Sequence, residues 1–300
     1  MLEPEAAVGR IRAAFGGPEG YRCLHAKGGF YAGTFTATPE AAELCRAGHF
    51  SGVEIPVTVR WSNAGGNPEV GDHHPDIRGM AVSFQLPDGT TADLLGQTSP
   101  RFPVRTVEEF VALTEASRRL WTLPLHLARH PRLVPVLLAS ARARAISSHV
   151  SYAEPTYHPV HAYRWLDAAG QGAWVRYSFV PHARAGDRLE ESFTGPDRLR
   201  DEIRARLARG PVDYDLHVRV AGPRDDPHDP TSVWRGARDL VAGRLSVTRA
   251  VPDPEFAGAV VVFDPTRVVD GIELSEDPIL RHRPAVYGAS VSRRARPREK

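Results

Sequence analysis

The sequence has 300 residues, of which 42% are hydrophobic and 25% charged, and its formal net charge is +2. This balance is ordinary for a globular protein, and so small a net charge gives no reason to expect nucleic acid or an anionic membrane as a partner. No apolar run approaches the ~20 residues of a membrane span, and the N-terminus lacks the features of a secretion signal, which predicts a cytoplasmic protein. The two cysteines disfavour both a disulfide framework and a structural zinc site.

The first predicted elements are a hairpin and a helix. Hydrophobic and polar residues alternate over 80–86, which predicts a strand, and Pro87-Asp88-Gly89 predicts a turn into a second strand at 91–95. The sequence from Thr106 to Glu109 fits a capping box, in which the threonine and glutamate side chains each bond a free backbone N–H. A helix is therefore predicted to start there.

A second helical segment and a second hairpin follow. Residues 124–148 have helical composition, but Pro131 and Pro135 are expected to break or kink any helix over this range. Alternating patterns over 161–166 and 173–180 predict two strands, because the short polar segment between them suits a turn.

The C-terminal third mixes helices and strands. Apolar residues at helical spacing predict a helix over 196–209, and alternation predicts strands over 214–220 and 258–263. The last helix is predicted to run from an N-cap at Ser275 to about Tyr287. Hairpin connections favour an antiparallel sheet or barrel over a βαβ arrangement, so the predicted class is α+β.

Familiar motifs of nucleotide and metal chemistry do not appear. The sequence has no Gly-x-Gly-x-x-Gly after a strand, no Walker loop, no His-Glu-x-x-His and no Cys-x-x-Cys. One segment, His73-His74-Pro75-Asp76, contains metal-ligand side chains. Adjacent histidines point to opposite sides of an extended chain, so this segment fits a polar loop better than a metal site.

Arg283 and Tyr287 form the most informative pair in the sequence. Their four-residue spacing places them on one face of a helix, one turn apart. A guanidinium beside a phenol favours the phenolate form, and a phenolate can serve as an axial ligand to haem iron. The spacing alone equally fits an ordinary surface pair, so the rest of the sequence has to decide.

The segment from Arg22 to Gly28, which reads Arg-Cys-Leu-His-Ala-Lys-Gly, resembles the haem-containing catalase superfamily. Further segments agree in the same order, namely 59–62, 76–84, 93–100, 102–110 and 263–287. The resemblance covers roughly residues 20–294. It implies a single domain over 1–300, built as a catalase-like antiparallel β-barrel with surrounding helices.

The resemblance implies a distal side made of five residues. His25 matches the distal histidine, which moves a proton between the two peroxide oxygens, and Ser62 matches the serine that orients it. Phe110 matches the aromatic residue that packs on the haem face, and Leu24 the apolar residue beside the histidine. Asp76 matches an acid of the access channel.

The resemblance also implies the cofactor, haem b, and the residues that hold it. Tyr287 matches the proximal iron ligand and Arg283 its charged partner. Arg22, Arg60 and Arg294 match the positions that bind the haem propionates, as guanidinium groups bind carboxylates well.

The sequence departs from the catalase pattern in four ways. Gln97 stands where catalases carry a distal asparagine that helps to position a second hydrogen peroxide. Pro284 lies inside the predicted proximal helix, and the sequence ends soon after that helix, so the C-terminal helical and flavodoxin-like domains are expected to be absent. The segment 161–165 lacks a clear match to the NADPH-binding residues of larger catalases.

These departures resemble the catalase-related peroxidases, which reduce organic hydroperoxides or hydrogen peroxide with an external electron donor. The prediction is such an enzyme, with weak catalase activity, a peroxide and a small-molecule electron donor as partners, and a homodimer as the expected assembly. One alternative is a fatty-acid hydroperoxide isomerase of the allene oxide synthase type. Another is a haem-binding protein without turnover, which would need no distal acid–base group.

Overall fold

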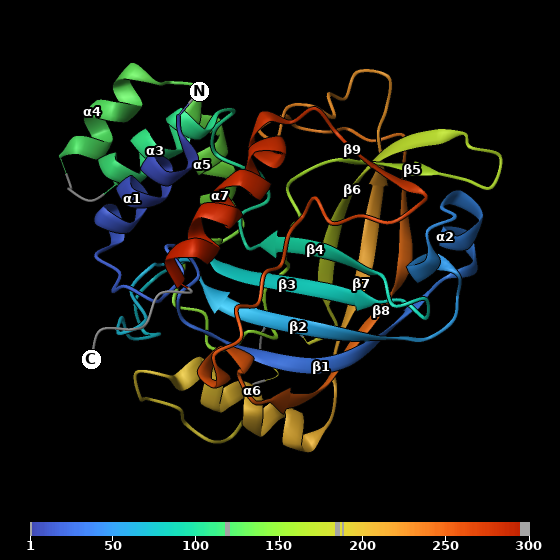
Figure 1. Cartoon of the computed structure of the whole chain (residues 1–300), viewed down its shortest axis with the longest axis horizontal. Coiled ribbons are helices and arrows are strands. Elements are labelled where there is room, and N and C mark those ends of the chain that lie inside the picture. The colour runs from blue at the N-terminus through green and yellow to red at the C-terminus, as the bar shows by residue number, and fades with distance from the viewer. Residues whose placement is uncertain (1, 118–120, 184–186, 188, 295–300) are drawn as a thin grey trace.

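In a computed structural model, the chain is described over residues 2–117, 121–183, 187 and 189–294. Within these ranges nine strands form one antiparallel sheet in the order β4-β3-β2-β1-β8-β7-β6-β5-β9 (Figure 1). The strands are β1 (Gly28–Ala37), β2 (Ile55–Asn63), β3 (Arg78–Gln85), β4 (Thr91–Gln97), β5 (Tyr163–Leu166), β6 (Gly172–Pro181), β7 (Val212–Val220), β8 (Arg238–Val251) and β9 (Ile272–Leu274).

The sheet curls on itself. Gln97, the last residue of β4, bridges to His158, and the neighbouring Tyr157 bridges to Phe179 of β6. Irregularities in the β1–β8 and β7–β8 pairings add to the twist that bends the strands. The predicted α+β class, with an antiparallel barrel-like sheet, is confirmed.

The main hydrophobic core fills the inside of this curl. Alternate residues of the strands point inward, among them Phe35 of β1, Trp61 of β2, Trp165 of β5 and Tyr214 of β7, each under 2% exposed. Burying side chains of this kind stabilises a fold by about 1.5–3 kcal/mol each. The core therefore holds the strands in a fixed relation, on which the site depends.

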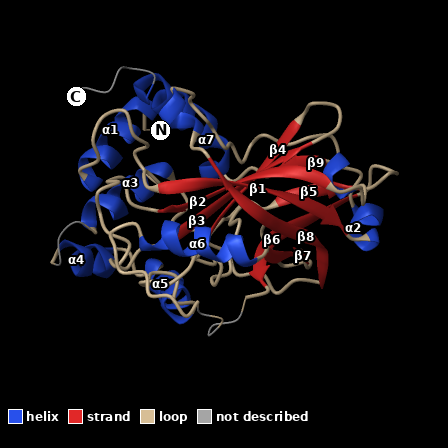
Figure 2. Ribbon diagram, turned by 90° about the horizontal axis from the view of Figure 1, so that it is seen from below, coloured by secondary structure: helices blue, strands red, loops and turns tan. Residues whose placement is uncertain are grey.

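Seven helices surround the described part of the sheet: α1 (Pro4–Phe15), α2 (Pro39–Leu44), α3 (Val107–Ala116), α4 (Thr122–Arg129), α5 (Leu133–Arg142), α6 (Arg198–Arg209) and α7 (Pro278–Arg294). Helices α1, α3, α4 and α5 gather at one end of the sheet, whereas α2 lies at the opposite end (Figures 1 and 2). Helix α7 packs against α1 and α3, and α6 packs against β8. None of the helices in the described ranges has the length and apolar character that crossing a membrane requires.

Most of the predicted elements are confirmed. β3 and β4 form the hairpin around 87–89, and β5 and β6 form the second hairpin. Helix α3 begins with the predicted capping box, in which Glu109 N donates to Thr106 Oγ1 (3.2 Å) and Thr106 N donates to Glu109 Oε2 (3.3 Å). The helical segment at 124–148 is broken at Pro131, which separates α4 from α5.

The strand predicted over 258–263 is wrong. The segment follows a 3-10 turn at Pro254–Ala257 and has no ladder partner in the described structure. Its backbone is held by arginine side chains instead, because Val261 O accepts from Arg22 and Val262 O accepts from Arg267. Alternating residues here mark an extended chain that is not part of the sheet.

The predicted limits of the last helix are also wrong. Asp277 caps α7, since its Oδ1 accepts from Ile279 N at 2.8 Å, whereas the hydroxyl of Ser275 has no partner among the described residues. The helix continues beyond Tyr287 and carries Arg294 in its last turn. The proximal pair and one of the predicted propionate ligands therefore share a single helix.

Candidate functional site

The segment before β1 holds His25 in an uncommon backbone conformation. Its φ is +56°, in the left-handed region that residues other than glycine seldom adopt. The N–H groups of His25 and Ala26 donate to Ala64 O (3.0 Å) and Gly65 O (3.1 Å), which fix the turn against the loop after β2. Backbone strain of this kind persists only where the surroundings enforce it, and it is frequent at functional sites.

The imidazole of His25 lies against β2 and β3. Its Nδ1 is 3.0 Å from Ser62 Oγ. Ser62 pairs with Gly79 across these strands, and a Cβ at Gly79 would stand only 2.6 Å from His25 Cε1. The structure thus brings His25 and Ser62 together and adds Gly79, whose absent side chain makes room for the ring. In the sequence, only the position of this glycine within the 76–84 segment pointed to it.

His25 is neutral at physiological pH. Burial lowers its pKa to about 3, and the positive charges of Arg60, Arg283 and Arg22 act in the same direction. With Nδ1 beside Ser62, the other ring nitrogen is left to exchange a proton with a bound molecule. The effect of Arg283 also places the proximal helix within electrostatic reach of the distal histidine, although the two residues lie at opposite ends of the sequence.

Gln97 and Asp76 both lie near residues that contact His25. Gln97 pairs with Gly79 across β3 and β4, and its half-buried side chain bonds no other described residue. Asp76 Oδ2 accepts from Gly65 N at 3.0 Å, so this acid contacts the loop that holds the backbone of His25. Burial raises the pKa of Asp76, and the Gly65 N–H opposes that rise. The structure therefore places both side chains close to the distal segment.

The two apolar side chains predicted near the haem, Phe110 on its face and Leu24 beside the histidine, lie among the helices. Leu24 packs against a buried cluster that includes Val8 of α1, and Val286 of α7 packs against the same cluster. Phe110 of α3 belongs to the same cluster, and its ring centroid is 5.3 Å from that of Phe102. Both residues stay half-buried, at the junction between the distal loop and α7.

The proximal pair adopts the predicted geometry. Arg283 Nη1 donates to Tyr287 Oη at 2.9 Å, one turn apart on α7. Burial on its own would lower the pKa of Arg283, but Tyr287, Tyr163 and Asp277 outweigh it and raise that pKa. A permanently charged guanidinium therefore stands beside the phenol oxygen.

A buried histidine–aspartate pair holds the start of the helix that carries Arg283 and Tyr287. His161 Nδ1 is 2.6 Å from Asp277 Oδ2, and both side chains are at most 2% exposed. Burial lowers the pKa of His161, whereas its bond to Asp277 opposes that shift. Asp277 also caps α7, so the pair fixes the helix that carries Arg283. The sequence gives no signal for this pair, because the two residues are 116 positions apart and no local motif joins them.

The three arginines predicted to bind propionates form one cluster. Arg60 Nη2 donates to His25 O at 2.9 Å, which ties the cluster to the distal turn. Arg22 and Arg294 both donate to Glu255 Oε1, at 2.6 and 2.7 Å. Glu255 was not singled out in the sequence, and it is the acid that these two arginines share.

The cluster suits the carboxylates of a haem. The Nε atoms of Arg22, Arg60 and Arg294 are buried and have no hydrogen-bond partner among the described residues. Burial, followed by the charge of Arg22, lowers the pKa of Arg60 to about 9, so it remains charged at neutral pH. Arg22 and Arg294 already bind the carboxylate of Glu255, so these two guanidiniums are oriented to pair with a carboxylate. These residues fit haem propionates, as Tyr287 fits the iron.

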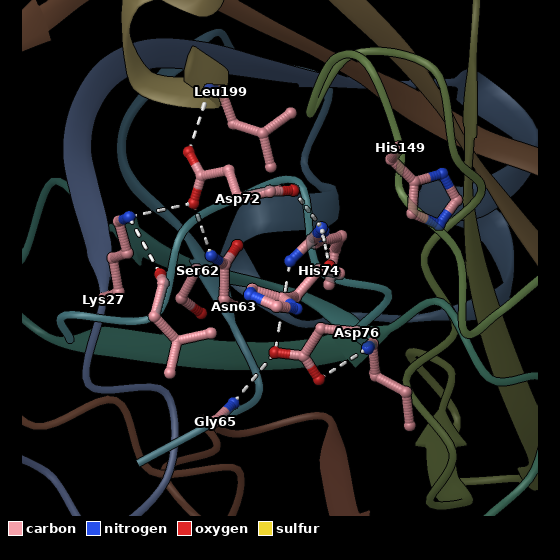
Figure 3. Close-up of polar contacts among 12 residues, drawn as sticks. Lys27, Ser62, Asn63, Gly65, Asp72, His74, Asp76, His149 and Leu199 are labelled. Atoms are coloured by element: carbon pink, nitrogen blue, oxygen red, sulfur yellow. Dashed lines mark hydrogen bonds and ion pairs between the residues drawn. The ribbon is translucent and has the colours of Figure 1, made fainter. Parts of the chain in front are cut away.

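A buried acid links the distal segment to α6. Asp72 is 1% exposed and accepts from Asn63 Nδ2 (2.7 Å) and from Leu199 N (2.9 Å), as Figure 3 shows. The ammonium of Lys27, two residues after His25, lies 3.2 Å from the same carboxylate. Asp72 therefore caps the first turn of α6 and connects this helix to the loop that holds the distal histidine.

The His73–Asp76 segment behaves as a polar loop. The rings of His73 and His74 lie with their centroids 4.2 Å apart and are tilted by 38°, and His74 O accepts from Arg78 at 3.3 Å. Across the described part of the chain, no group of three or more histidine, cysteine, aspartate or glutamate side chains could hold a metal ion.

The sequence is similar to known proteins of one family. The sequence matches the catalase family model over residues 18–298. A catalase-related peroxidase of Mycolicibacterium paratuberculosis is 45% identical over 98% of this chain and 95% of that protein. A protein of the same name from Synechococcus elongatus is 33% identical, over 98% and 89%. A catalase of Pseudomonas aeruginosa is 27% identical over 89% of this chain but only 55% of its own length.

Solved structures show the same fold. A bacterial catalase superposes with a TM-score of 0.78 at 21% identity, over 93% of this chain and 60% of that chain. A fungal catalase gives a TM-score of 0.78 at 19% identity, over 92% and 60%. Together with the family match over nearly the whole sequence, these likenesses establish that the chain belongs to the catalase family.

Proposed function

We propose that this protein is a haem b-dependent peroxidase that reduces organic hydroperoxides and hydrogen peroxide with an external electron donor. The observation that carries this proposal is that a neutral His25, held by Ser62, lies within electrostatic reach of Arg283, which donates a hydrogen bond to Tyr287. The relatives named catalase-related peroxidase match this chain along nearly their full length, which supports the same activity here.

The residues that would hold the cofactor follow from the site. Tyr287 would ligate the iron, Arg22, Arg60 and Arg294 would bind the propionates, and Phe110 and Leu24 would pack on the ring. The bound haem would supply the redox chemistry of peroxide reduction. Arg283 keeps a positive charge beside the ligand oxygen, which favours its anionic form.

The protein itself moves the proton. His25 Nδ1 lies 3.0 Å from Ser62 Oγ. In the tautomer whose Nδ1–H donates to this hydroxyl, the Nε2 lone pair accepts a proton from one peroxide oxygen and returns it to the leaving oxygen. A neutral ring can do this at physiological pH, and the low pKa of His25 keeps it neutral. The charged form could not accept the proton.

Gln97 is the residue that sets this chain apart from a catalase. Its side chain is one methylene longer than that of the asparagine at this position in catalases, so we expect it to position a second hydrogen peroxide less well. We expect peroxide cleavage to be retained and catalase turnover to be weak. The chain spans about 55% of the matched Pseudomonas aeruginosa catalase, whereas it spans 95% of the catalase-related peroxidase from Mycolicibacterium paratuberculosis.

Stopped-flow spectroscopy of the haem-loaded protein tests the proposal. Mixing with an organic hydroperoxide and then with a reducing donor should oxidise the haem and then return it to the ferric state, with an alcohol as product. An epoxide from a fatty-acid hydroperoxide, without donor oxidation, would identify an isomerase of the allene oxide synthase type. Haem binding without any reaction would identify a carrier. Light scattering of the same sample tests the proposed homodimer.

A further inference from the structure

A cleft of about 330 Å³ lies outside the site described above, between the start of β1, the end of β8 and α6. Figure 1 shows α6 running beneath β1 on this side of the sheet. A volume of this size accommodates a small organic molecule. The polar and small residues of its wall are Gly28, Gly29, Tyr31, Arg200, Arg204 and Asp253.

Two guanidinium groups make this cleft positively charged. Arg204 is exposed and makes no hydrogen bond or ion pair with any residue that the structure describes. Arg200 pairs with Asp197, and its Nε is buried without a partner in the described ranges. The acid in the wall, Asp253, is already engaged, because its Oδ1 accepts from Glu255 N at 2.8 Å. An anion would therefore find at least one free guanidinium.

The hydroxyl of Tyr31 also lacks a partner. The side chain is 1% exposed, and its oxygen bonds no described residue. A buried hydroxyl without a hydrogen bond is unfavourable, so such groups usually point to a missing partner. The hydroxyl lies beside Gly29, where a Cβ would approach it to 2.8 Å, and Gly29 forms part of the cleft wall. The hydroxyl lies directly behind the Gly29 part of the cleft wall, so a ligand that supplies the missing bond has to reach past this glycine.

The cleft adjoins the arginine cluster of the cofactor site. A Cβ at Gly28 would stand 3.1 Å from Arg60 Cζ, so this residue of the cleft wall lies against that guanidinium. Asp253 lies two residues before Glu255, which binds Arg22 and Arg294. The cleft and the propionate-binding cluster therefore share a wall.

Helix α6 is anchored to this wall. Its start is fixed by the bond from Leu199 N to Asp72, which Lys27 Nζ contacts at 3.2 Å (Figure 3). Lys27 Nζ also contacts Asp197 at 2.8 Å. Arg200 and Arg204 thus project from an element whose position is tied to the distal segment. The two charges of the cleft keep a fixed relation to the cofactor site.

We propose that this cleft binds the reducing substrate, and that this substrate is a small anionic reductant such as a phenol that carries a carboxylate. The inference rests on the proposed peroxidase function. The anionic group pairs with Arg200 and Arg204, and the substrate hydroxyl bonds Tyr31, next to the propionate edge at Arg60. Two substrate molecules each give one electron and one proton, while the O–O bond of one hydroperoxide breaks to yield an alcohol and water.

The test compares two donors that differ only in charge, 3-(4-hydroxyphenyl)propionate and its neutral amide. The haem-loaded wild type, Arg204→Gln and Arg224→Gln are assayed, because Arg224 is an exposed arginine outside the cleft that likewise bonds no described residue. In Arg204→Gln we expect KM for the anionic donor to rise about tenfold, the size of losing one charged hydrogen bond. KM for the amide, KM for the peroxide and the haem spectrum should not change, and Arg224→Gln should match the wild type.

A second readout does not depend on turnover. In the ferric protein, NMR relaxation of the donor protons reports binding close to the iron, and this effect should weaken in Arg204→Gln. Tyr31→Phe should also raise KM for both phenols, while its thermal stability stays at or above that of the wild type. If the anionic donor shows the same KM and the same relaxation in the wild type and Arg204→Gln, the cleft assignment is refuted. If neither donor is oxidised by the wild type, the peroxidase function fails, and the relaxation measurement still decides the cleft.

Discussion

Replacing Gly79 by alanine should misplace the distal histidine without disturbing the fold. The new Cβ would stand 2.6 Å from His25 Cε1, 2.8 Å from its Nδ1 and 3.1 Å from Ser62 Oγ. Ordinary contact begins near 3.4 Å, so the ring has to retreat by about 0.8 Å, which stretches its bond to Ser62. A displacement of this size at a reacting group lowers a rate by about 10²-fold.

Stopped-flow measurement of the reaction with peroxide tests this prediction in haem-loaded protein. We expect the rate constant of Gly79→Ala to fall by about 10²-fold, with unchanged haem content and thermal stability lowered only slightly. Gly195→Ala is the matched control, because a Cβ there meets no atom within 4 Å. A native rate in Gly79→Ala would refute the reasoning, since the ring would then tolerate the contact or play no part in the reaction.

Four further predictions concern residues of the candidate site. Tyr287→Phe should lose most of its haem or its ferric–phenolate absorption, and an unchanged spectrum would contradict the ligand assignment. His25→Ala should keep its haem but cleave peroxide about 10²–10⁴-fold more slowly. In the wild type, the rate of peroxide cleavage should stay level as the pH falls from neutral and drop only near the His25 pKa of about 3, because protonation removes the accepting lone pair. A drop near pH 6.5 would argue against the buried, neutral ring. Asp277→Ala should destabilise the protein by about 3 kcal/mol in chemical denaturation, since it removes a helix cap and the partner of a buried histidine. Glu255→Gln should slow the transfer of haem to apomyoglobin, because one negative charge that competes with the propionates is gone, and a faster transfer would instead mean that Glu255 organises the cluster.

The sequence allowed the local elements and the motif residues to be predicted. The β3–β4 hairpin could be predicted because Pro87-Asp88-Gly89 is a strong turn signal. The start of α3 could be predicted because a capping box occupies only four consecutive residues. His25, Ser62, Arg283 and Tyr287 could be named because each belongs to a short segment with its own pattern. The structure places them in the pairs that this pattern implies.

Other features depend on contacts between distant segments. β1 begins with Gly28-Gly29, and in β8 Val241 is exposed while the adjacent Ala242 and Gly243 are both buried, so neither strand shows a clean hydrophobic alternation. Glu255 follows a proline-rich turn and has significance only because Arg22 and Arg294 reach it from both ends of the sequence. Such residues can be recognised only when the fold has brought their partners together.

Helix α7 carries both the proposed iron ligand, Tyr287, and one arginine proposed to bind a propionate, Arg294. Tyr287 and Arg294 are seven residues apart, which corresponds to two turns and about 10 Å along the axis. Two of the groups proposed to hold the haem therefore follow the orientation of one helix, whose start is fixed by Asp277 and His161. Substitutions at that buried pair should shift both proposed haem contacts together, and circular dichroism in the Soret band would report this change even where haem affinity is preserved.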